Sequence, residues 1–500
     1  MMRNRIVFAL AGSSLMVAPA LGMAETAPLA HTEAMAHAGE AAQPVATIEG
    51  ARPNVLLIVF DDLGFGQLGF AGHPIIKTPH IDRLARQGMV FTNGYSGGAV
   101  CSPSRVSLMT GRDASRLSSP ANDILLRPQD RTFAHMLSAA GYKTALFGKF
   151  GIGSHFGSTD PMAMGFGHWV GVLHNIEAHR QYPPFLYRDN ELVFIRQNLA
   201  GAKGAYAQRM FTDAALAFLD KQDGSQPFMA MMSYTSPHSE MAAPEDFVAP
   251  YRGKFSETPY NGLEGPTPAS QFPEYYPEPM AQPNAVQAGM IAALDAYVGE
   301  LLAKLDEKGL ANSTLVILTS DNGPHSEGGG DIIAQRASGP YRGGKRDLTE
   351  GGIHMPLIAR WPTIIKEGRI EDELVSFADF LPTFATLAGE PEAAASWGSN
   401  GLSFAPLLAS DKARLPERML YWAFAHNLGD PNSNVIGKVE QAGRIGKWKA
   451  IRVEQNAPVQ LFDLSRDPGE TRDLAAVQPK VAADFAKRFD ARLEEQARYR

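Results

Sequence analysis

The sequence predicts an α/β protein: a large, mostly parallel sheet sandwiched by helices, followed by a smaller C-terminal region of antiparallel sheet plus helix. Continuous apolar runs rich in branched residues indicate strands buried on both faces of a sheet. Segments with a helical apolar period separate these runs, and short alternating strands follow near the C-terminus. The 500 residues, 44% of them hydrophobic and 20% charged, are enough for one large domain and a smaller one.

The N-terminal residues predict export. The first 24 residues place Arg3 and Arg5 before an apolar stretch that ends near Ala24, which is the pattern of a cleaved secretory signal peptide. A membrane anchor is disfavoured, because polar residues and a proline interrupt the stretch and it is shorter than the roughly 20 apolar residues of a span. Residues 25–50 have no apolar period and predict a flexible lead-in. We therefore expect a periplasmic or secreted protein without a stable membrane anchor.

The large domain is expected to span residues 51–400. NVLLIVFDD (54–62) and STLVILTSDNG (313–323) are apolar runs that end abruptly in polar residues. KTALFGK (143–149) and QPFMAMMSYTSPH (226–238) repeat this pattern in looser form. In a parallel α/β sheet, ligands bind beyond the carboxyl ends of the strands. The polar residues at these ends are therefore expected to share one cleft.

The rest of the chain predicts a surface excursion, a boundary and a small domain. Residues 239–285 are dense in Pro, Tyr and Glu and predict a long excursion near the cleft. The stretch 391–416 carries Gly, Ser and Pro and is interpreted as a boundary. Within the small domain, residues 415–500, RMLYWAF, AGRIGKWKAIRVE and VQLFDLSRDPGE predict short antiparallel strands. A helix at about 477–497 is expected to close this sheet.

Four residues after two of the strands predict a metal site: Asp61, Asp62, Asp321 and Asn322. Three carboxylates at one sheet edge repel one another unless a cation lies among them. Oxygen ligands favour Ca²⁺ or Mg²⁺ over zinc. A single Asp in such a place is usually a helix cap or a turn former. The doubling of polar residues at two strand ends favours the metal site.

Four basic residues near strand ends or Gly-rich turns predict an oxyanion pocket: Arg105, Lys149, His238 and Lys345. Singly, each is explained as a solvated surface charge. Together with a divalent ion, they would surround a small tetrahedral anion with charged donors. The formal net charge of -7 gives the chain no global basic field, so we expect no nucleic-acid partner.

The stretch AVCSPSRVSLMTGR (99–112) contains the only cysteine of the chain, Cys101. It has no partner for an internal disulfide, and its ordinary explanation is a small buried hydrophobe. Pro103 fixes its own backbone and is expected to bias Ser102 to an extended form. The residues that follow predict a helix whose positive end faces an anion. A nucleophile at position 101 fits this arrangement.

The segment CSPSRVSLMTGR resembles the Cys-type sulfatase motif, C-x-P-S-R-x-x-x-(Leu/Met)-T-G-R. The family's opening is similar to RPNVLLIVFDDLGFGQLGFAGHPIIKTPHIDRLARQGMVFTNGYSG, and its later segments are similar to TLVILTSDNGPH, YRGGKRDLTEGGIHMPLIARWP, GKWKAI and QLFDLSRDPGETRDLA. The resemblance covers about residues 52–475. It implies an alkaline phosphatase-like fold and hydrolysis of sulfate monoesters of aryl or carbohydrate alcohols.

The resemblance implies a role for each candidate residue. A formylglycine-generating maturation enzyme, which reads Pro103 and Arg105, would convert Cys101 to Cα-formylglycine (3-oxoalanine). The family's calcium ligands match four residues and the modified residue itself: Asp61, Asp62, Asp321, Asn322 and Cys101. Its sulfate-binding and proton-transfer residues match a second set: Arg105, Lys149, His238 and Lys345.

The resemblance also implies the reaction. One hydroxyl of the hydrated aldehyde, held on the metal, attacks sulfur and expels the alcohol. The sulfated hemiacetal that remains expels sulfate when its second hydroxyl loses a proton, and the aldehyde is regenerated. His238 and Lys345 would assist the departing alcohol, while Arg105 and Lys149 steady residue 101 and the sulfate oxygens.

The chain departs from the family pattern at two positions. Gly151, in GKFGIG, stands where a histidine commonly accepts the hemiacetal proton. His179, in EAHRQYPPFLYRDN, is the predicted replacement, and His155 is a second candidate. If it has no catalytic role, each of these two residues is interpreted as an ordinary surface histidine. His354 stands where the family usually has arginine and is interpreted as a substrate-shaping or packing change.

Two alternatives follow from these residues. A phosphonate monoester or phosphodiester hydrolase of the same superfamily shares the C-x-P-S-R motif, and phosphate is close to sulfate in shape. A catalytically impaired glycan-binding homologue would retain the pocket without turnover, and the glycine at position 151 is the observation that favours it.

The aromatic residues Tyr182, Phe185 and Tyr187 fit either stacking on sugar rings or ordinary packing.

Overall fold

The computed structural model describes residues 48–499 apart from 155–157, 263–278 and 428–435. The predicted signal peptide, nearly all of the predicted lead-in and His155 lie outside the described residues. Residues 45–500 form one compact unit. The division of this unit into domains of residues 51–400 and 415–500 stays a prediction.

The central sheet of the described residues has ten strands in the order β11-β2-β10-β9-β1-β8-β4-β5-β6-β7. Five neighbours, β9, β1, β8, β4 and β5, run parallel, whereas β10 and β6 run antiparallel to the strands beside them. The bounds in chain order are β1 (Asn54–Asp61), β2 (Met89–Phe91), β4 (Lys143–Lys149), β5 (His168–Val172), β6 (Phe185–Arg188), β7 (Glu191–Phe194), β8 (Phe228–Pro237), β9 (Thr314–Ser320), β10 (Leu357–Arg360) and β11 (Arg369–Glu371). The predicted mostly parallel sheet is confirmed.

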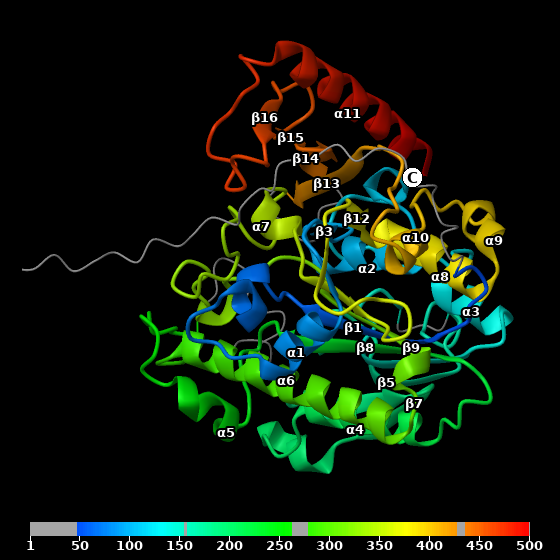
Figure 1. Ribbon diagram of the computed structural model, residues 1–500. Helices are drawn as coiled ribbons and strands as arrows, with labels where there is room; N and C mark the ends of the chain where they lie inside the picture. Colours follow the sequence, from blue (N-terminus) through cyan, green and yellow to red (C-terminus); the bar gives the residue numbers. More distant parts are fainter. Residues whose placement is uncertain (1–47, 155–157, 263–278, 428–435, 500) are drawn as a thin grey trace, which may run out of the picture. The chain divides into compact units, whose positions relative to one another are not determined.

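Helices cover both faces of this sheet (Figure 1). One core cluster joins Val55, Leu57 and Val59 of β1 to α2 (Cys101–Thr110), α3 (Phe133–Ala139) and α8 (Phe380–Ala388). A second joins the alternate residues of β1 to α1 (Pro79–Gln87), α4 (Ala207–Asp220) and α6 (Pro283–Glu307). Successive side chains of a strand point to opposite faces, so a run that is apolar at every position needs a core on each side.

Helix α6 is, among the described helices, the one long and apolar enough to cross a membrane by length and composition. Most of its apolar window is buried, and the helix packs against α1, α4, α5 (Glu245–Val248) and β8. Its apolar length is therefore explained by its place in the core.

The C-terminal region is the predicted small antiparallel sheet with a helix. Its strands are β13 (Leu420–Asn427), β14 (Ile436–Ile445), β15 (Trp448–Arg452) and β16 (Gln460–Asp463). Helix α11 (Pro479–Tyr499) covers one face through Phe485 and Phe489. The other face packs on residues of the large sheet region, including the short strand β3 (Gly94–Tyr95), which pairs with β12 (Val375–Ser376).

Two of the segments between these elements contain short helices. Residues 391–416, interpreted from sequence as a boundary, include α9 (Pro391–Ser396) and α10 (Ala405–Ala409), whose apolar residues join the core of the large sheet. The predicted excursion at 239–285 includes α5 and the first turn of α6, and part of it lies outside the described residues. A last short helix, α7 (Glu350–Ile353), precedes β10.

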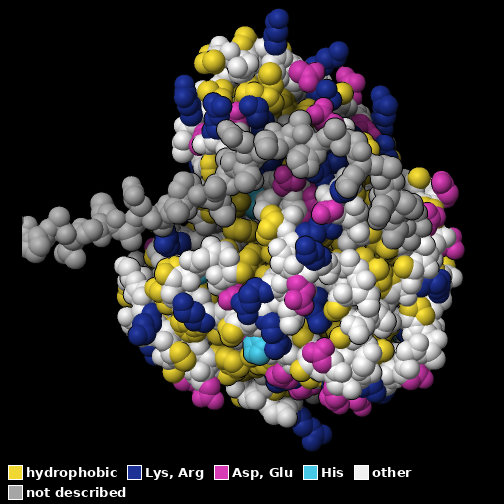
Figure 2. Space-filling view, viewed as in Figure 1, with side chains coloured by type: hydrophobic (Ala, Val, Ile, Leu, Met, Phe, Trp, Pro, Cys, Tyr) yellow, Lys and Arg dark blue, Asp and Glu magenta, His cyan; other side chains and the backbone are white. Residues whose placement is uncertain are grey.

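The charged side chains of the surface are mixed in sign. Figure 2 shows Lys and Arg interspersed with Asp and Glu over the face in view. This distribution fits the small excess of 53 acidic over 46 basic residues.

Candidate active site

The predicted metal ligands lie at the carboxyl ends of two neighbouring strands. Asp61 is the last residue of β1 and Asp62 follows it, while Asp321 and Asn322 follow β9. Because β1 and β9 pair in parallel, with Phe60 opposite Ser320, their polar ends meet at one edge. Ligand atoms of Asp61, Asp62, Asp321 and Cys101 all lie within 4.8 Å of one another. We call these four residues the strand-end cluster.

Cys101 enters the cluster as the first residue of α2. Its Sγ lies 3.2 Å from Asp61 Oδ1 and 3.8 Å from Asp62 Oδ1. The expectation that Ser102 is extended is wrong, because the helix begins at Cys101 and contains Ser102. Pro103 is tolerated as its third residue, since an N–H in the first turn has no partner within the helix.

Arg105 and Lys149 neutralise the buried carboxylates. Arg105, one turn along α2, donates from Nε to Asp321 Oδ2 at 2.9 Å and from Nη1 to Ser233 Oγ at 2.6 Å. Lys149, at the end of β4, donates from Nζ to Asp61 Oδ2 at 2.8 Å. Both cations are almost fully buried, which is tolerated because each has a charged acceptor.

Lys345 and His238 both lie next to Asp62 of the strand-end cluster. Lys345 lies in the Gly-rich loop before α7, and its Nζ is 2.9 Å from Asp62 Oδ2 and 2.8 Å from His238 Nε2. His238 follows β8, and its Nε2 lies 3.3 Å from Asp62 Oδ2. All of the predicted metal ligands and all four predicted basic residues therefore lie together in the structure.

The charges shift the pKa values of these groups in opposite directions. Burial raises the pKa of Asp61, but Lys149, His238 and Arg105 together hold it well below its usual range. Burial and the Asp61 charge raise the pKa of Asp321 to about 7. Burial and the same charge raise the pKa of the Cys101 thiol well above its usual value. In these surroundings Cys101 is a neutral thiol, which is a weak nucleophile.

The donor set fits a hard divalent cation. Three carboxylates converge, and Asn322 Oδ1 is buried without a hydrogen-bond partner. Its Nδ2 donates to Asp62 Oδ1 at 2.6 Å, so the amide lies against the carboxylates. A buried polar atom without a partner is costly unless another group, such as an ion, satisfies it. Oxygen atoms of this kind are the ligands that Ca²⁺ and Mg²⁺ prefer.

His179 lies beside the strand-end cluster, next to His238, although it is distant from the Cys101 motif in sequence. It ends the short 3₁₀ helix Glu177–His179, and its ring stacks on His238 with centroids 4.5 Å apart and planes at 15°. Burial and the neighbouring charge of His238 hold the pKa of His179 well below its usual value. A neutral imidazole beside the strand-end cluster is able to accept a proton.

Gly151 is explained by its backbone and its neighbours. Its φ is +75°, and a Cβ at this position would lie 2.9 Å from Lys149 Cε. Both the left-handed backbone and the Lys149 side chain therefore disfavour any larger residue here. A histidine at position 151 would require a different path of the chain after β4.

Two residues of the site, His325 and Glu327, were not predicted from the sequence. The His325 ring stacks on the ring of His238, with centroids 5.4 Å apart. Glu327 Oε2 accepts from Lys345 Nζ at 2.9 Å. Both come shortly after Asp321 in the stretch DNGPHSE, so the rule that polar residues gather after a strand would have found them.

His354 and the aromatic residues of segment 182–187 lie in packed surroundings. His354 is buried against Tyr341, with ring centroids 4.2 Å apart, and its Nε2 lies 2.8 Å from Thr92 O. Tyr187 stacks on Trp169 at 5.4 Å. Tyr182 and Phe185 contact other aromatic rings in the same way. These contacts account for the side chains by packing alone.

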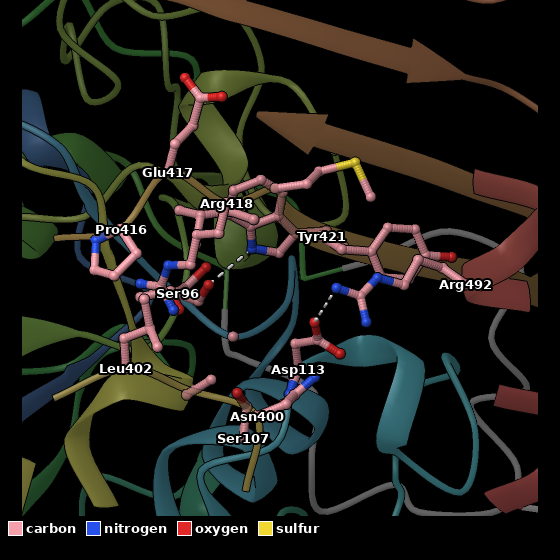
Figure 3. A pocket seen from close by; sticks show the side chains of 16 residues that line it. Ser96, Ser107, Asp113, Asn400, Leu402, Pro416, Glu417, Arg418, Tyr421 and Arg492 are labelled. Carbon is pink, nitrogen blue, oxygen red and sulfur yellow. Dashed lines mark hydrogen bonds and ion pairs between the residues drawn. The ribbon is translucent and has the colours of Figure 1, made fainter. Parts of the chain in front are cut away.

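A cavity of about 270 Å³ lies between α2 and the C-terminal sheet. Figure 3 shows Arg492 and Asp113 paired at one side of it, with Ser107 and Asn400 near Asp113. Among the described residues that line it, none belongs to the strand-end cluster. The cavity is therefore distinct from the candidate active site.

The fold and the site define a class: a hydrolase of anionic esters, in which a helix N-terminal residue and paired carboxylates meet at the carboxyl edge of a parallel sheet. The model of the sulfatase family matches residues 53–390, and that of the C-terminal region of N-sulphoglucosamine sulphohydrolase matches residues 343–498. The chain belongs to the sulfatase family and is a sulfuric ester hydrolase.

Individual relatives agree with this assignment. The chain is 31% identical to steryl-sulfatase of Mus musculus, over 84% of this chain and 78% of that protein. It is 31% identical to arylsulfatase A of Bos taurus, over 86% and 85%. The crystal structure of Ps i-CgsB in complex with k-i-k-neocarrahexaose has a TM-score of 0.73 and 25% identity, covering 89% of this chain and 93% of that chain. A phosphonate monoester hydrolase of Agrobacterium radiobacter shares the fold with a TM-score of 0.61 and 21% identity.

Proposed function

We propose that this sulfatase hydrolyses sulfate monoesters by means of Cys101 converted to formylglycine. The observation that carries the proposal is the position of Cys101, at the start of α2 and within 4.8 Å of three carboxylates. The unmodified Cys101 thiol is neutral in this site and has no disulfide partner, so it is a weak nucleophile. Its hydrated aldehyde would supply an attacking hydroxyl at the same place.

The proposed metal is Ca²⁺, with Mg²⁺ as the alternative. Asp61, Asp62, Asp321, Asn322 and the modified residue 101 would hold it through oxygen atoms. When bound, the ion would lower the pKa of an attached hydroxyl and polarise a sulfate oxygen. Its two positive charges would also relieve the repulsion among the three carboxylates.

The remaining residues have proposed roles that follow from their contacts. Arg105 and Lys149 would orient residue 101 and the sulfate oxygens, because both reach Asp321 or Asp61 beside it. Lys345, 2.8 Å from His238 Nε2, would share a proton with that histidine and so assist the departing alcohol. His179, stacked on His238, would accept the proton for which Gly151 offers no side chain.

The deciding experiment combines mass and activity. The protein is produced with and without a formylglycine-generating enzyme, and the peptide containing residue 101 is weighed. We expect the aldehyde mass and hydrolysis of 4-nitrophenyl sulfate only with the maturation enzyme, and neither in Cys101→Ala. Full activity of Cys101→Ser from the same host would contradict the aldehyde route. A fully converted protein without turnover of any sulfate ester would support the impaired glycan-binding homologue.

A matched pair of esters tests the phosphonate alternative. The sulfate and the phenylphosphonate monoester of 4-nitrophenol share one leaving group, so their kcat/KM values compare the two acids directly. We expect the sulfate to be preferred. A preference for the phosphonate would favour the phosphonate or phosphodiester hydrolase of the same fold.

The proposed substrates are aryl or carbohydrate sulfates met outside the cytoplasm. The structural relative Ps i-CgsB was solved with a neocarrahexaose, which supports a screen of sulfated saccharides beside aryl sulfates. Export to the periplasm or the medium, with cleavage near Ala24, is proposed from Arg3, Arg5 and the apolar stretch after them.

A further inference from the structure

The rim of the candidate active site carries a cation that the proposed reaction does not use. Arg346 directly follows Lys345 in the chain, and its side chain is 51% exposed, whereas that of Lys345 is 5% exposed. Its Nη1 lies 2.6 Å from Glu327 Oε1. The other oxygen of Glu327 accepts from Lys345 Nζ at 2.9 Å. One carboxylate therefore holds a buried cation of the site and an exposed cation at its mouth.

The backbone presents Arg346 in a costly conformation. Its φ is +77°, in the left-handed region that residues with a Cβ rarely adopt. Two hydrogen bonds fix this conformation, from Arg346 N to Ala99 O and from Lys345 N to Pro324 O, each at 2.8 Å. Residues in sparsely populated backbone regions cluster at active sites and ligand-binding sites. Ala99 lies two residues before Cys101, so the backbone of Arg346 is tied to the segment that carries Cys101.

The charges of the site leave room for a second negative group. Four cations, Arg105, Lys149, Lys345 and Arg346, face four carboxylates, Asp61, Asp62, Asp321 and Glu327. A divalent ion in the proposed site would add two positive charges, and one sulfate ester would remove one. Of the four cations, Arg346 is the one with an exposed side chain, so it is the one that a second negative group could reach from solvent.

We propose that Arg346 forms an anion subsite at the mouth of the active site, which recognises a second anionic group, a carboxylate or a sulfo group, on the alcohol part of the substrate. The inference rests on the proposed sulfatase reaction and names its substrate class, doubly anionic sulfate esters. The planar guanidinium presents parallel N–H donors that match both oxygens of a carboxylate. Glu327 holds the Nη1 nitrogen of this guanidinium, and about half of the Arg346 side chain stays open to solvent.

The test compares esters of similar shape with and without the second charge, and the ratio between wild type and variant cancels the difference between their leaving groups. The probes are 3- and 4-carboxyphenyl sulfate, their neutral carbamoyl counterparts, and 4-sulfophenyl sulfate. For the wild type, we expect a higher kcat/KM for a charged probe than for its neutral counterpart. In Arg346→Gln, this preference should fall about tenfold, the value of one charge-assisted hydrogen bond at a partly exposed site. The preference should also fall as salt rises from about 20 to about 200 mM.

The control is Arg342→Gln, in the same loop. Arg342 is also exposed and lies over the Phe462 ring at 5.5 Å. We expect it to leave the charge preference unchanged. An equal loss for charged and neutral probes in Arg346→Gln would assign Arg346 to holding Glu327 and Lys345, and would overturn the subsite. An unchanged preference would overturn it as well.

Binding without turnover separates this inference from the proposed function. Calorimetry is carried out on Cys101→Ala and on Cys101→Ala/Arg346→Gln with 4-carboxyphenyl and 4-carbamoylphenyl sulfate. Tighter binding of the carboxylate that depends on Arg346 supports the subsite, even if the wild type hydrolyses none of the probes and the proposed reaction fails. Equal affinities in the two variants would overturn the subsite while leaving the sulfatase reaction intact.

Discussion

At the scale of single residues, buried carboxylates and buried cations compensate one another around Cys101. Asp61 and Asp321 lie in the core, where a carboxylate alone would be strongly disfavoured. Lys149 and Arg105 compensate them by direct contacts of 2.8 and 2.9 Å. Removal of one member would leave its partner as an unpaired buried charge, so these residues act as one unit.

His179 gives the sharpest prediction at this scale. His179→Ala is expected to lower kcat by about a hundredfold or more, because a positioned general base contributes that much. Binding of sulfate or vanadate, measured by calorimetry, should persist, since the cations of the site are unchanged. His168→Ala is the control, because His168 is a partly exposed histidine paired with Asp189. Full turnover in His179→Ala would remove this residue from the proton transfer.

At the scale of elements, the turn of α7 supports the turn after β9 that carries the proposed metal ligands Asp321 and Asn322. Gly323 N donates to Gly352 O at 2.9 Å, and a Cβ on Gly323 would lie 2.0 Å from Gly351 O. The two backbones approach so closely that only glycine fits between them. The position of Asn322 therefore depends on α7 as well as on β9.

Gly323→Ala is expected to lower the melting temperature and to weaken calcium binding measured by calorimetry. The forced shift of the turn should cost about 1–3 kcal/mol of stability, as overpacking does elsewhere. Gly167→Ala is the matched control, because the nearest atom to its Cβ would be 3.5 Å away. Equal effects of the two substitutions would contradict the supporting role of α7.

Helix α1 is capped from another helix, and this contact predicts a pH dependence. Asp295 of α6 accepts hydrogen bonds from the backbone N–H of His80 at 3.0 Å and of Ile81 at 2.8 Å. Burial raises the pKa of Asp295 from 3.8 to about 6. Between these two values the folded state binds the proton more tightly than the unfolded state does. The contribution to stability is therefore complete below about pH 4 and is lost as the pH rises through about 6.

Asp295→Asn should reduce the decline in the free energy of unfolding between pH 4 and 6. The difference from the wild type is expected to be of the order of 2 kcal/mol across this interval. Urea unfolding at several pH values measures it. Asp306→Asn, an exposed substitution on the same helix, should follow the wild-type profile. A profile for Asp295→Asn parallel to that of the wild type would show that Asp295 does not titrate in this range.

At the scale of the whole molecule, a buried ion network joins the C-terminal sheet to the site region. Lys449 of β15 is fully buried and contacts Glu350 Oε1 at 2.8 Å and Glu470 Oε1 at 3.3 Å. Glu350 begins α7, and its second oxygen accepts from Tyr95 Oη at 2.7 Å. Arg444 donates to the same tyrosine oxygen. The network therefore connects three distant parts of the chain.

Lys449→Met is expected to lower the free energy of unfolding by about 3–5 kcal/mol, since it leaves two buried carboxylates without their cation. The Lys447→Met substitution should cost less, about 1 kcal/mol, because the Lys447 side chain is half exposed where it pairs with Asp463, and Ser465 also donates to that carboxylate. Chemical denaturation measures both. The double variant Lys449→Met/Glu470→Gln should recover part of the loss. A similar cost for the two lysines would argue against a structural role for the network.

Much of the fold and part of the site were predictable because their signals are local. Apolar runs that end in paired polar residues indicated the parallel strands and the edge at which Asp61 and Asp321 meet. The C-terminal strands were equally visible from their alternation. The conformation of Ser102 was predicted wrongly, because the preference of a residue before proline is weak compared with the formation of a whole helix.

By itself, the sequence determined the class of fold, the carboxyl edge that carries the site and the identity of the residue at its centre, because these follow from periodicity and from one long motif. Only the tertiary structure decided that the rings of His179 and His325 both stack on His238 and that Glu327 contacts both Lys345 and Arg346. It also decided that Arg346 lies half exposed at the rim of the centre. Such contacts depend on how loops from separate strands pack together, and no local pattern of residues encodes that packing.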